Sequence, residues 1–206
     1  MRFLLLSSLV TAVLLMSCKS EYADLKPVRA DVTCIGKFKP TFQVNWYNAS
    51  VDVIGKHLSG LLLFKAMPDS SLRVVFTNEV GITFFDFGFS SDGKFKVYQV
   101  IKQLDKKAVI NLLRKDFDLI IMREIRAGNL KSFTRNGEIF VARTGKSETD
   151  YFITDKDCAS LLRIEKASKK KIKTMVTRIG GEQVPDSVFL KHYTFNMTIA
   201  LKKLKR

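Results

Sequence analysis

Side chains able to carry out catalysis are few in this sequence and are not spaced for it. The two histidines, His57 and His192, have no cysteine, histidine or carboxylate at the spacing of a zinc site. Neither the Gly-x-Ser-x-Gly elbow nor the Gly-x-Gly-x-x-Gly loop occurs. The triplet Asp86-Phe87-Gly88 matches a kinase metal-binding motif, but the accompanying kinase motifs are missing, which favours a strand end with a turn glycine. We therefore expect no enzyme, no metal and no cofactor.

One cysteine near the start of the chain has a distinctive setting. An apolar run over residues 3–16 follows a single arginine and ends at Ser17-Cys18. The run is shorter than the roughly 20 residues of a membrane-spanning helix, and it is typical of a secretory leader. The residues Leu-Met-Ser-Cys at 15–18 resemble the lipobox of bacterial lipoproteins, although Met16 is larger than usual. The resemblance implies that the thiol of Cys18 is acylated; a secreted protein in which Cys18 has no role is the alternative.

The charge of the chain is strongly positive, with a formal net charge of +15. Without the leader about 190 residues remain, which is the size of one domain. An exported lipoprotein meets anionic headgroups and lipopolysaccharide, so we expect no nucleic-acid partner. Lysines that only keep a β-rich protein soluble and its edge strands unpaired are an equal alternative.

Two further cysteines, Cys34 and Cys158, lie in the rest of the chain. An oxidising compartment permits a disulfide between them. The sequence does not show that they are close together, and we favour two separate buried thiols.

The hydrophobic pattern of the chain beyond the leader has mostly a period of two. This period predicts strands, and the short turns between them, such as Pro68-Asp69, predict an antiparallel meander. The expected strands are about eleven, at 42–47, 51–53, 58–65, 72–78, 81–89, 94–101, 138–143, 150–154, 160–166, 172–179 and 187–201. The fold class is therefore mainly β.

One segment in the middle of the chain has a helical period instead. Apolar residues from Ala108 to Ile125 recur at spacings of three and four, which predicts one amphipathic helix over 105–127 with Asp105 as its N-cap. We also expect residues 1–17 to be a leader, residues 18–36 a lipidated cysteine and tether, and residues 37–206 the folded domain.

The segment 72–81 carries a resemblance to a known family. Arg73 and an apolar strand run into Thr77-Asn78-Glu79-Val80-Gly81, followed at once by another alternating strand. This segment resembles the lipoprotein-localisation proteins LolA and LolB, and LolB more closely, where the corresponding residues read Thr-Asn-x-Leu-Gly. The central helix and Val184-Pro185 with the extended residues after it lie in the same order as in the family. The likeness covers residues 37–204 in layout, and only the ten-residue segment is specific.

The resemblance implies an unclosed antiparallel half-barrel of about eleven strands with a helical lid. It implies a cavity that takes the acyl chains of lipoproteins, and an outer-membrane anchor facing the periplasm. A loop of the family's receptor enters the bilayer; here that loop comprises Thr77, Asn78, Glu79, Val80 and Gly81, with Val80 in the leucine position. Valine is smaller than leucine and Glu79 replaces a proline, so Val80 as an ordinary hairpin residue remains the alternative.

The cavity is expected to be lined by one alternating set of apolar side chains and by the helix. We predict that this lining comprises Trp46, Leu62, Phe64, Phe76, Phe84, Leu112, Phe117, Ile121, Met197 and Ile199. The expected function is to bind the acyl chains of other lipoproteins, received from a soluble periplasmic carrier, and to insert them into the outer membrane as a monomer. The alternative is an envelope lipoprotein with a fully packed core that binds a soluble partner or lipopolysaccharide through its basic face.

Overall fold

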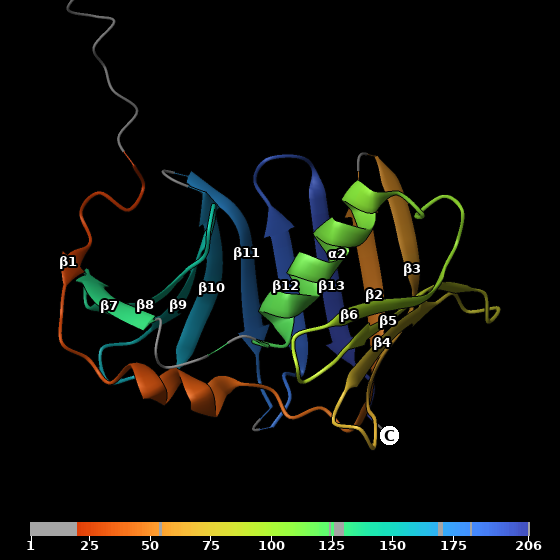
Figure 1. Cartoon of the computed structure of the whole chain (residues 1–206), viewed down its shortest axis with the longest axis horizontal. Helices are drawn as coiled ribbons and strands as arrows, with labels where there is room; N and C mark the ends of the chain where they lie inside the picture. The colour runs from red at the N-terminus through yellow and green to blue at the C-terminus, as the bar shows by residue number, and fades with distance from the viewer. Residues whose placement is uncertain are drawn as a thin grey trace, which may run out of the picture.

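One large antiparallel sheet makes up most of the protein. The computed structural model describes residues 20–53, 55–123, 125, 130–168, 171–181 and 183–205. Thirteen strands follow the order β1-β7-β8-β9-β10-β11-β12-β13-β2-β3-β4-β5-β6, so the two edge strands are β1 and β6 and the sheet is not closed (Figure 1). The expected fold class, a mainly β unclosed half-barrel with a helix, is therefore confirmed.

Most strands follow one another through short connections, and within the described ranges only the link from β6 to β7 contains an α-helix. The elements are β1 (Lys26–Pro27), η1 (Val32–Phe38), β2 (Val44–Val53), β3 (Lys56–Ala66), β4 (Leu72–Thr77), β5 (Thr83–Phe89), β6 (Phe95–Val100), α2 (Lys107–Ile120), β7 (Leu130–Arg135), β8 (Glu138–Thr144), β9 (Thr149–Thr154), β10 (Leu161–Ser168), β11 (Lys171–Ile179), β12 (Ser187–His192) and β13 (Met197–Lys203).

Two strands from opposite ends of the chain lie side by side at the centre of the sheet. β13 pairs with β2 from Met197↔Val53 to Lys203↔Tyr47, and all other neighbouring pairs except β1 and β7 follow each other in sequence. The sheet consequently consists of two meanders, β2 to β6 and β7 to β13. α2 connects the outer strands β6 and β7.

Helix α2 lies across β12, β13 and β2 inside the curve of the sheet (Figure 1). Its spacing of three and four puts Leu113, Phe117 and Ile120 on one buried face. The helix is shorter than the expected 105–127. Asp105 is not its N-cap: Lys106 holds that position and makes no side-chain capping bond. The helix ends at Ile120, and Met122 has a positive φ of 48°, which cannot continue a right-handed helix.

The strands also differ from the expectation in four places, one of which is the short strand β1 in the segment expected to be a tether. The expected strands 42–47 and 51–53 form the single strand β2, because Asn48-Ala49-Ser50 continues the pairing instead of turning. The expected strand 187–201 is a hairpin of β12 and β13. Strand β7 was missed, since Leu130 and Phe133 are its only large apolar residues and its pairing with β8 supplies the backbone partners.

The segment expected to be a tether contacts the sheet at several points along its described part. Ile35 in η1 is fully buried in the core, and β1 pairs with β7. The ring of Tyr22 stacks on Tyr151 at 4.3 Å, and its hydroxyl donates a hydrogen bond to Glu165. We correct the expectation for residues 18–36 accordingly: the described residues 20–36 belong to the folded body.

A disulfide joins Cys34 in η1 to Cys158 in the turn between β9 and β10. The expectation of two separate thiols is therefore wrong. The cross-link fixes η1 to a part of the sheet that is 124 residues away in sequence. Sequence spacing alone could not show this, because the approach depends on the curvature of the sheet.

Candidate functional site

The apolar layer between α2 and the sheet contains most of the residues predicted to line a cavity. Seven of the ten are buried in the main core cluster: Leu62, Phe64, Phe76, Phe117, Ile121, Met197 and Ile199. Phe84 and Leu112 are partly buried and pack against that cluster. The structure thus brings nine of the ten residues to one region, where the side chains of the protein itself fill much of the space.

Trp46 is the exception, and its predicted position is corrected. Tyr47 and Ala49 are buried in the core, so the alternation along β2 turns Trp46 to the outer face of the sheet. The apolar pattern favoured Trp46, but the ring of Tyr47 enters the core because its hydroxyl finds a buried partner. That hydroxyl donates a 2.7 Å hydrogen bond to the carbonyl oxygen of Pro185.

Three phenylalanines of β5 form part of this layer and were not predicted. Phe85, Phe87 and Phe89 are almost fully buried. They alternate with Asp86 and Gly88, which take the other face, so the absence of a large apolar side chain at these two positions is the signal that identifies the inner set.

Phe64 occupies the middle of the layer and contacts both the sheet and the helix. Its ring stacks on Phe42 with 4.1 Å between centroids and meets the edge of Tyr47 at 5.6 Å. It also meets Phe117 of α2 at 6.2 Å, and Phe117 in turn lies 5.7 Å from Phe85. The inner face of α2 is consequently held by aromatic contacts on the β3 and β5 side.

On its other side α2 is held by buried polar groups. The carboxylate of Asp116, which is 1% exposed, lies 3.0 Å from Nε2 of His192 on β12. The other ring nitrogen of His192 lies 3.2 Å from the hydroxyl of Thr174 on β11. Burial raises the pKa of Asp116, while the hydrogen bond from His192 acts in the opposite direction.

A second polar contact joins α2 to the turn between β8 and β9. Lys115 donates a 2.9 Å hydrogen bond to Glu148, which also accepts one from Lys173 of β11. Burial acts to raise the pKa of Glu148, but these two lysines and the charge of Lys166 outweigh it and the pKa is lowered. The inner surface beneath α2 is therefore amphipathic, with aromatic rings towards β3 and β5 and ionic groups towards β8 to β12.

Removing the Asp116 carboxylate is expected to loosen α2. We predict that Asp116→Ala lowers the free energy of unfolding by about 3 kcal/mol, because His192 loses its partner in a buried site. Asp116→Asn keeps an oxygen at that position and is expected to cost less than about 1 kcal/mol. Urea denaturation of both variants checks this, and equal losses would show that the hydrogen bond is not the cause.

The loop between β4 and β5 presents apolar side chains to solvent. Val80 is 80% exposed and Ile82 is 55% exposed. The side-chain oxygen of Asn78 accepts hydrogen bonds from the backbone N–H groups of Val80 and Ile82, at 3.1 and 2.7 Å. Gly81 has a φ of +85°, which favours glycine. Asn78 thus fixes a tight loop whose tip is apolar, although Glu79 stands beside it.

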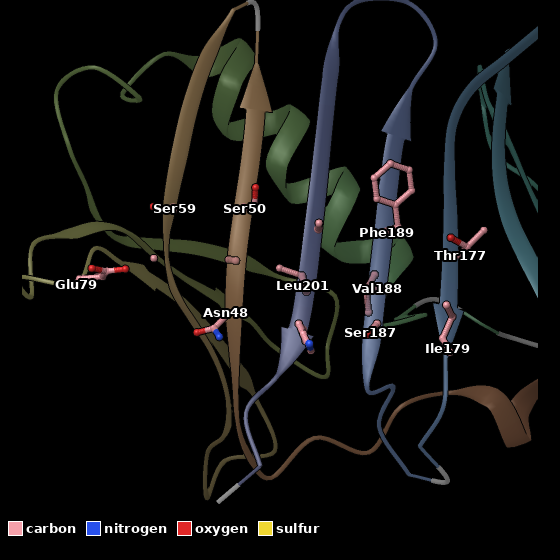
Figure 2. Close-up of a pocket in the computed structure, with 14 residues that line it drawn as sticks. Asn48, Ser50, Ser59, Glu79, Thr177, Ile179, Ser187, Val188, Phe189 and Leu201 are labelled. Carbon is pink, nitrogen blue, oxygen red and sulfur yellow. The ribbon is translucent and has the colours of Figure 1, made fainter.

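A shallow depression of about 530 Å³ lies on the outer face of the sheet, with α2 on the far side (Figure 2). Its floor contains small side chains, among them Ser50, Ser59 and Ala200, and the exposed Phe189 stands at its border. This face is separated by the sheet from the layer under α2, so the depression is not the predicted cavity.

Cys18, the predicted lipidation site, lies outside the described residues. Among the described residues no helix has the length and hydrophobicity needed to cross a bilayer. The same residues contain no group of three or more histidine, cysteine or carboxylate side chains placed to hold a metal ion.

Comparisons with known proteins give matches at the level of three-dimensional structure. No family model matches the sequence, and no curated protein matches it either. A DUF1329 family protein from Desulfovibrio piger is 11% identical over 87% of this chain and 92% of its own, with a TM-score of 0.45. A proposed outer membrane lipoprotein-sorting protein domain from Vibrio parahaemolyticus is 6% identical over 85% of this chain and 89% of its own, with a TM-score of 0.44. Both TM-scores are below 0.5, so neither likeness assigns a function to this chain.

Proposed function

We propose that this protein is an envelope lipoprotein, anchored in the outer membrane through Cys18 and facing the periplasm, that binds acyl chains of other lipoproteins and inserts them into that membrane. The observation that carries the proposal is the apolar layer beneath an amphipathic helix. Phe64 and Phe117 meet across this layer, and polar groups hold the same helix on its other side.

The physical need for such a protein follows from the hydrophobic effect. Each methylene of an acyl chain gains about 0.8 kcal/mol on leaving water, so a sixteen-carbon chain gains roughly 12 kcal/mol. A lipoprotein therefore crosses an aqueous compartment only if its chains stay covered. Passing them from the cavity of a soluble carrier to that of a membrane-anchored receptor requires no catalytic group.

Helix α2 would act as the lid of this receptor. Because Leu62, Phe64 and Phe117 are already buried, an acyl chain enters only if α2 moves away from the sheet. Movement breaks the contact between Asp116 and His192, whereas an acyl chain replaces the apolar contacts that are lost. The lid is therefore expected to be closed without cargo.

The loop carrying Val80 would provide the contact with the bilayer. We predict that Val80→Glu reduces the incorporation of a test lipoprotein into outer-membrane vesicles at least tenfold, because a charged tip does not enter the apolar region. Thermal unfolding should be unchanged, since Val80 is 80% exposed. Val44→Glu is the matched control because Val44 is also an exposed valine, 59% exposed on β2. Equal transfer by both variants and the unmodified protein would remove the role of the loop.

A second candidate function follows from the close packing under α2. An envelope lipoprotein whose core stays filled would bind a soluble partner or lipopolysaccharide through its basic surface, and the buried state of seven predicted lining residues favours it. A fluorescent fatty acid separates the two candidates. Saturable binding supports the carrier, and absence of binding supports the packed-core protein.

A further inference from the structure

The first described residues of the chain indicate which end of the sheet lies nearest to Cys18. Glu21 accepts a 2.9 Å hydrogen bond at its carboxylate from the backbone N–H of Ile172, at the start of β11. The next residue, Tyr22, is fixed by its stacking on Tyr151. Cys18 precedes Ser20 by two residues, a span of at most about 7 Å of extended chain. A lipid on Cys18 would therefore hold the β10–β11 end of the sheet at the bilayer surface.

Several connections meet at that same end, which we name the anchor end. The antiparallel pairings Ser168↔Lys171, Thr144↔Thr149 and Val53↔Lys56 place the hairpins β10–β11, β8–β9 and β2–β3 there. α2 also begins at this end, at the top of Figure 1. The described chain starts beside the β10–β11 hairpin in the same view.

The side chains exposed at the anchor end are rich in positive charge. Each of these connections contributes at least one exposed lysine, and the set is Lys56, Lys106, Lys107, Lys146 and Lys171. Of the acidic groups nearby, Glu148 is bound by Lys115 and Lys173, Asp52 lies 2.7 Å from His57, and Asp105 is exposed beside Lys106.

The hairpin turns at the opposite end carry acidic and basic side chains together. Asp69 lies in the β3–β4 turn, Asp92 pairs with Lys94 in the β5–β6 turn, and Asp155 and Asp157 flank Lys156 in the β9–β10 turn. The segment around η1 adds the exposed Lys37 and Lys39 at that end. Lysines are thus present at both ends. Those of the anchor end lie on the connections next to the predicted lipidation site, whereas those of the opposite end are remote from it.

We propose that the anchor end is an electrostatic docking surface for the anionic headgroups of a phospholipid bilayer. This inference rests on the proposed lipidation of Cys18 and extends it. One acyl-anchored residue leaves a domain free to rotate, whereas lysines within a Debye length of an anionic surface add attraction and select one orientation. The lysines of the anchor end are different residues from the apolar loop around Val80. The binding of each to a membrane can therefore be measured with separate variants.

The test uses the chain from residue 18 onward with Cys18→Ser, so that the lipid itself does not dominate binding. The protein is sedimented with phosphatidylcholine vesicles with and without phosphatidylglycerol. We expect binding only to the anionic vesicles, falling as salt rises. The variant Lys107→Glu/Lys146→Glu/Lys171→Glu should bind them at least about 100-fold more weakly, taking a factor of about five for each lysine. Lys107→Glu also suits the first turn of α2.

The matched control reverses three lysines at the opposite end, Lys37→Glu/Lys39→Glu/Lys205→Glu, and should bind nearly as well as the unmodified chain. Lys205 belongs to that end because it follows β13, whose first residue Met197 pairs with Val53 at the anchor end. An equal loss in both triple variants would overturn the proposed orientation, because bulk charge would then explain binding. No binding of the unmodified chain, or binding to dispersed lipopolysaccharide alone, would also overturn it. Fatty-acid binding by the anchor-end variant should be unchanged. A loss of fatty-acid binding in every protein, with vesicle binding retained, would instead contradict the proposed function alone.

Discussion

We expect removal of the disulfide between Cys34 and Cys158 to lower the free energy of unfolding by about 4 kcal/mol. The cross-link joins residues separated by 124 positions, and closing a loop of that length removes a large entropy from the unfolded chain. It also holds η1, whose Ile35 is fully buried, against the sheet. Urea denaturation of the oxidised protein and of a variant without both cysteines measures the loss.

The choice of variant matters because Cys158 has a positive φ of 52°. Asparagine tolerates this left-handed conformation better than most residues, so Cys34→Ala/Cys158→Asn removes the cross-link with little added backbone strain. Cys34→Ala/Cys158→Val is the comparison in which strain is added. A loss below about 1 kcal/mol in the asparagine variant would show that η1 is held by packing alone.

The second large effect is expected at the centre of the apolar layer. Phe64→Ala should lower the free energy of unfolding by about 4 kcal/mol, since it removes a buried ring and leaves a cavity. The ring contacts Phe42, Tyr47 and Phe117, so both the sheet and α2 lose packing. Thermal or urea unfolding checks the value.

The variant Phe64→Ala also tests whether an acyl chain can occupy the cavity left under α2. If acyl chains enter the layer under α2, a saturating fatty acid should restore part of the stability of Phe64→Ala, because a ligand that binds only the folded state stabilises it. Phe189→Ala is the matched control: Phe189 is 41% exposed on the outer face, and its loss should cost less than about 1 kcal/mol. Restoration of both variants to the same extent would indicate binding elsewhere.

Much of the fold could be predicted because its pattern is local. The period of two in β3, with Leu62 and Phe64 inward, follows directly from the sequence, and so does the buried face of α2. The pairing of β13 with β2 is non-local and has no signal in either strand. β7 was missed for a related reason, as its residues take their conformation from neighbours on both sides.

The candidate site was predictable in composition but not in every orientation. Alternation identifies two sets of residues on β2, and the hydroxyl of Tyr47 with its buried partner decides which set is inside. The polar half of the site was missed, since Asp116 and His192 are far apart in sequence and meet only when α2 crosses the sheet. The packing of residues 20–36 was missed because their partners, such as Tyr151, are equally distant.

Photo-crosslinking with a diazirine-bearing fatty acid tests acyl-chain binding under α2, because the adducts report where the chain lies. The chain with Cys18→Ser is irradiated with the probe, and adducts are located by mass spectrometry of its peptides. We expect saturable adducts on inner residues of β3 and on α2, such as Leu62, Phe64 and Phe117. Adducts confined to the outer face, around Phe189 and Ala200, or no saturable adduct at all, would contradict it.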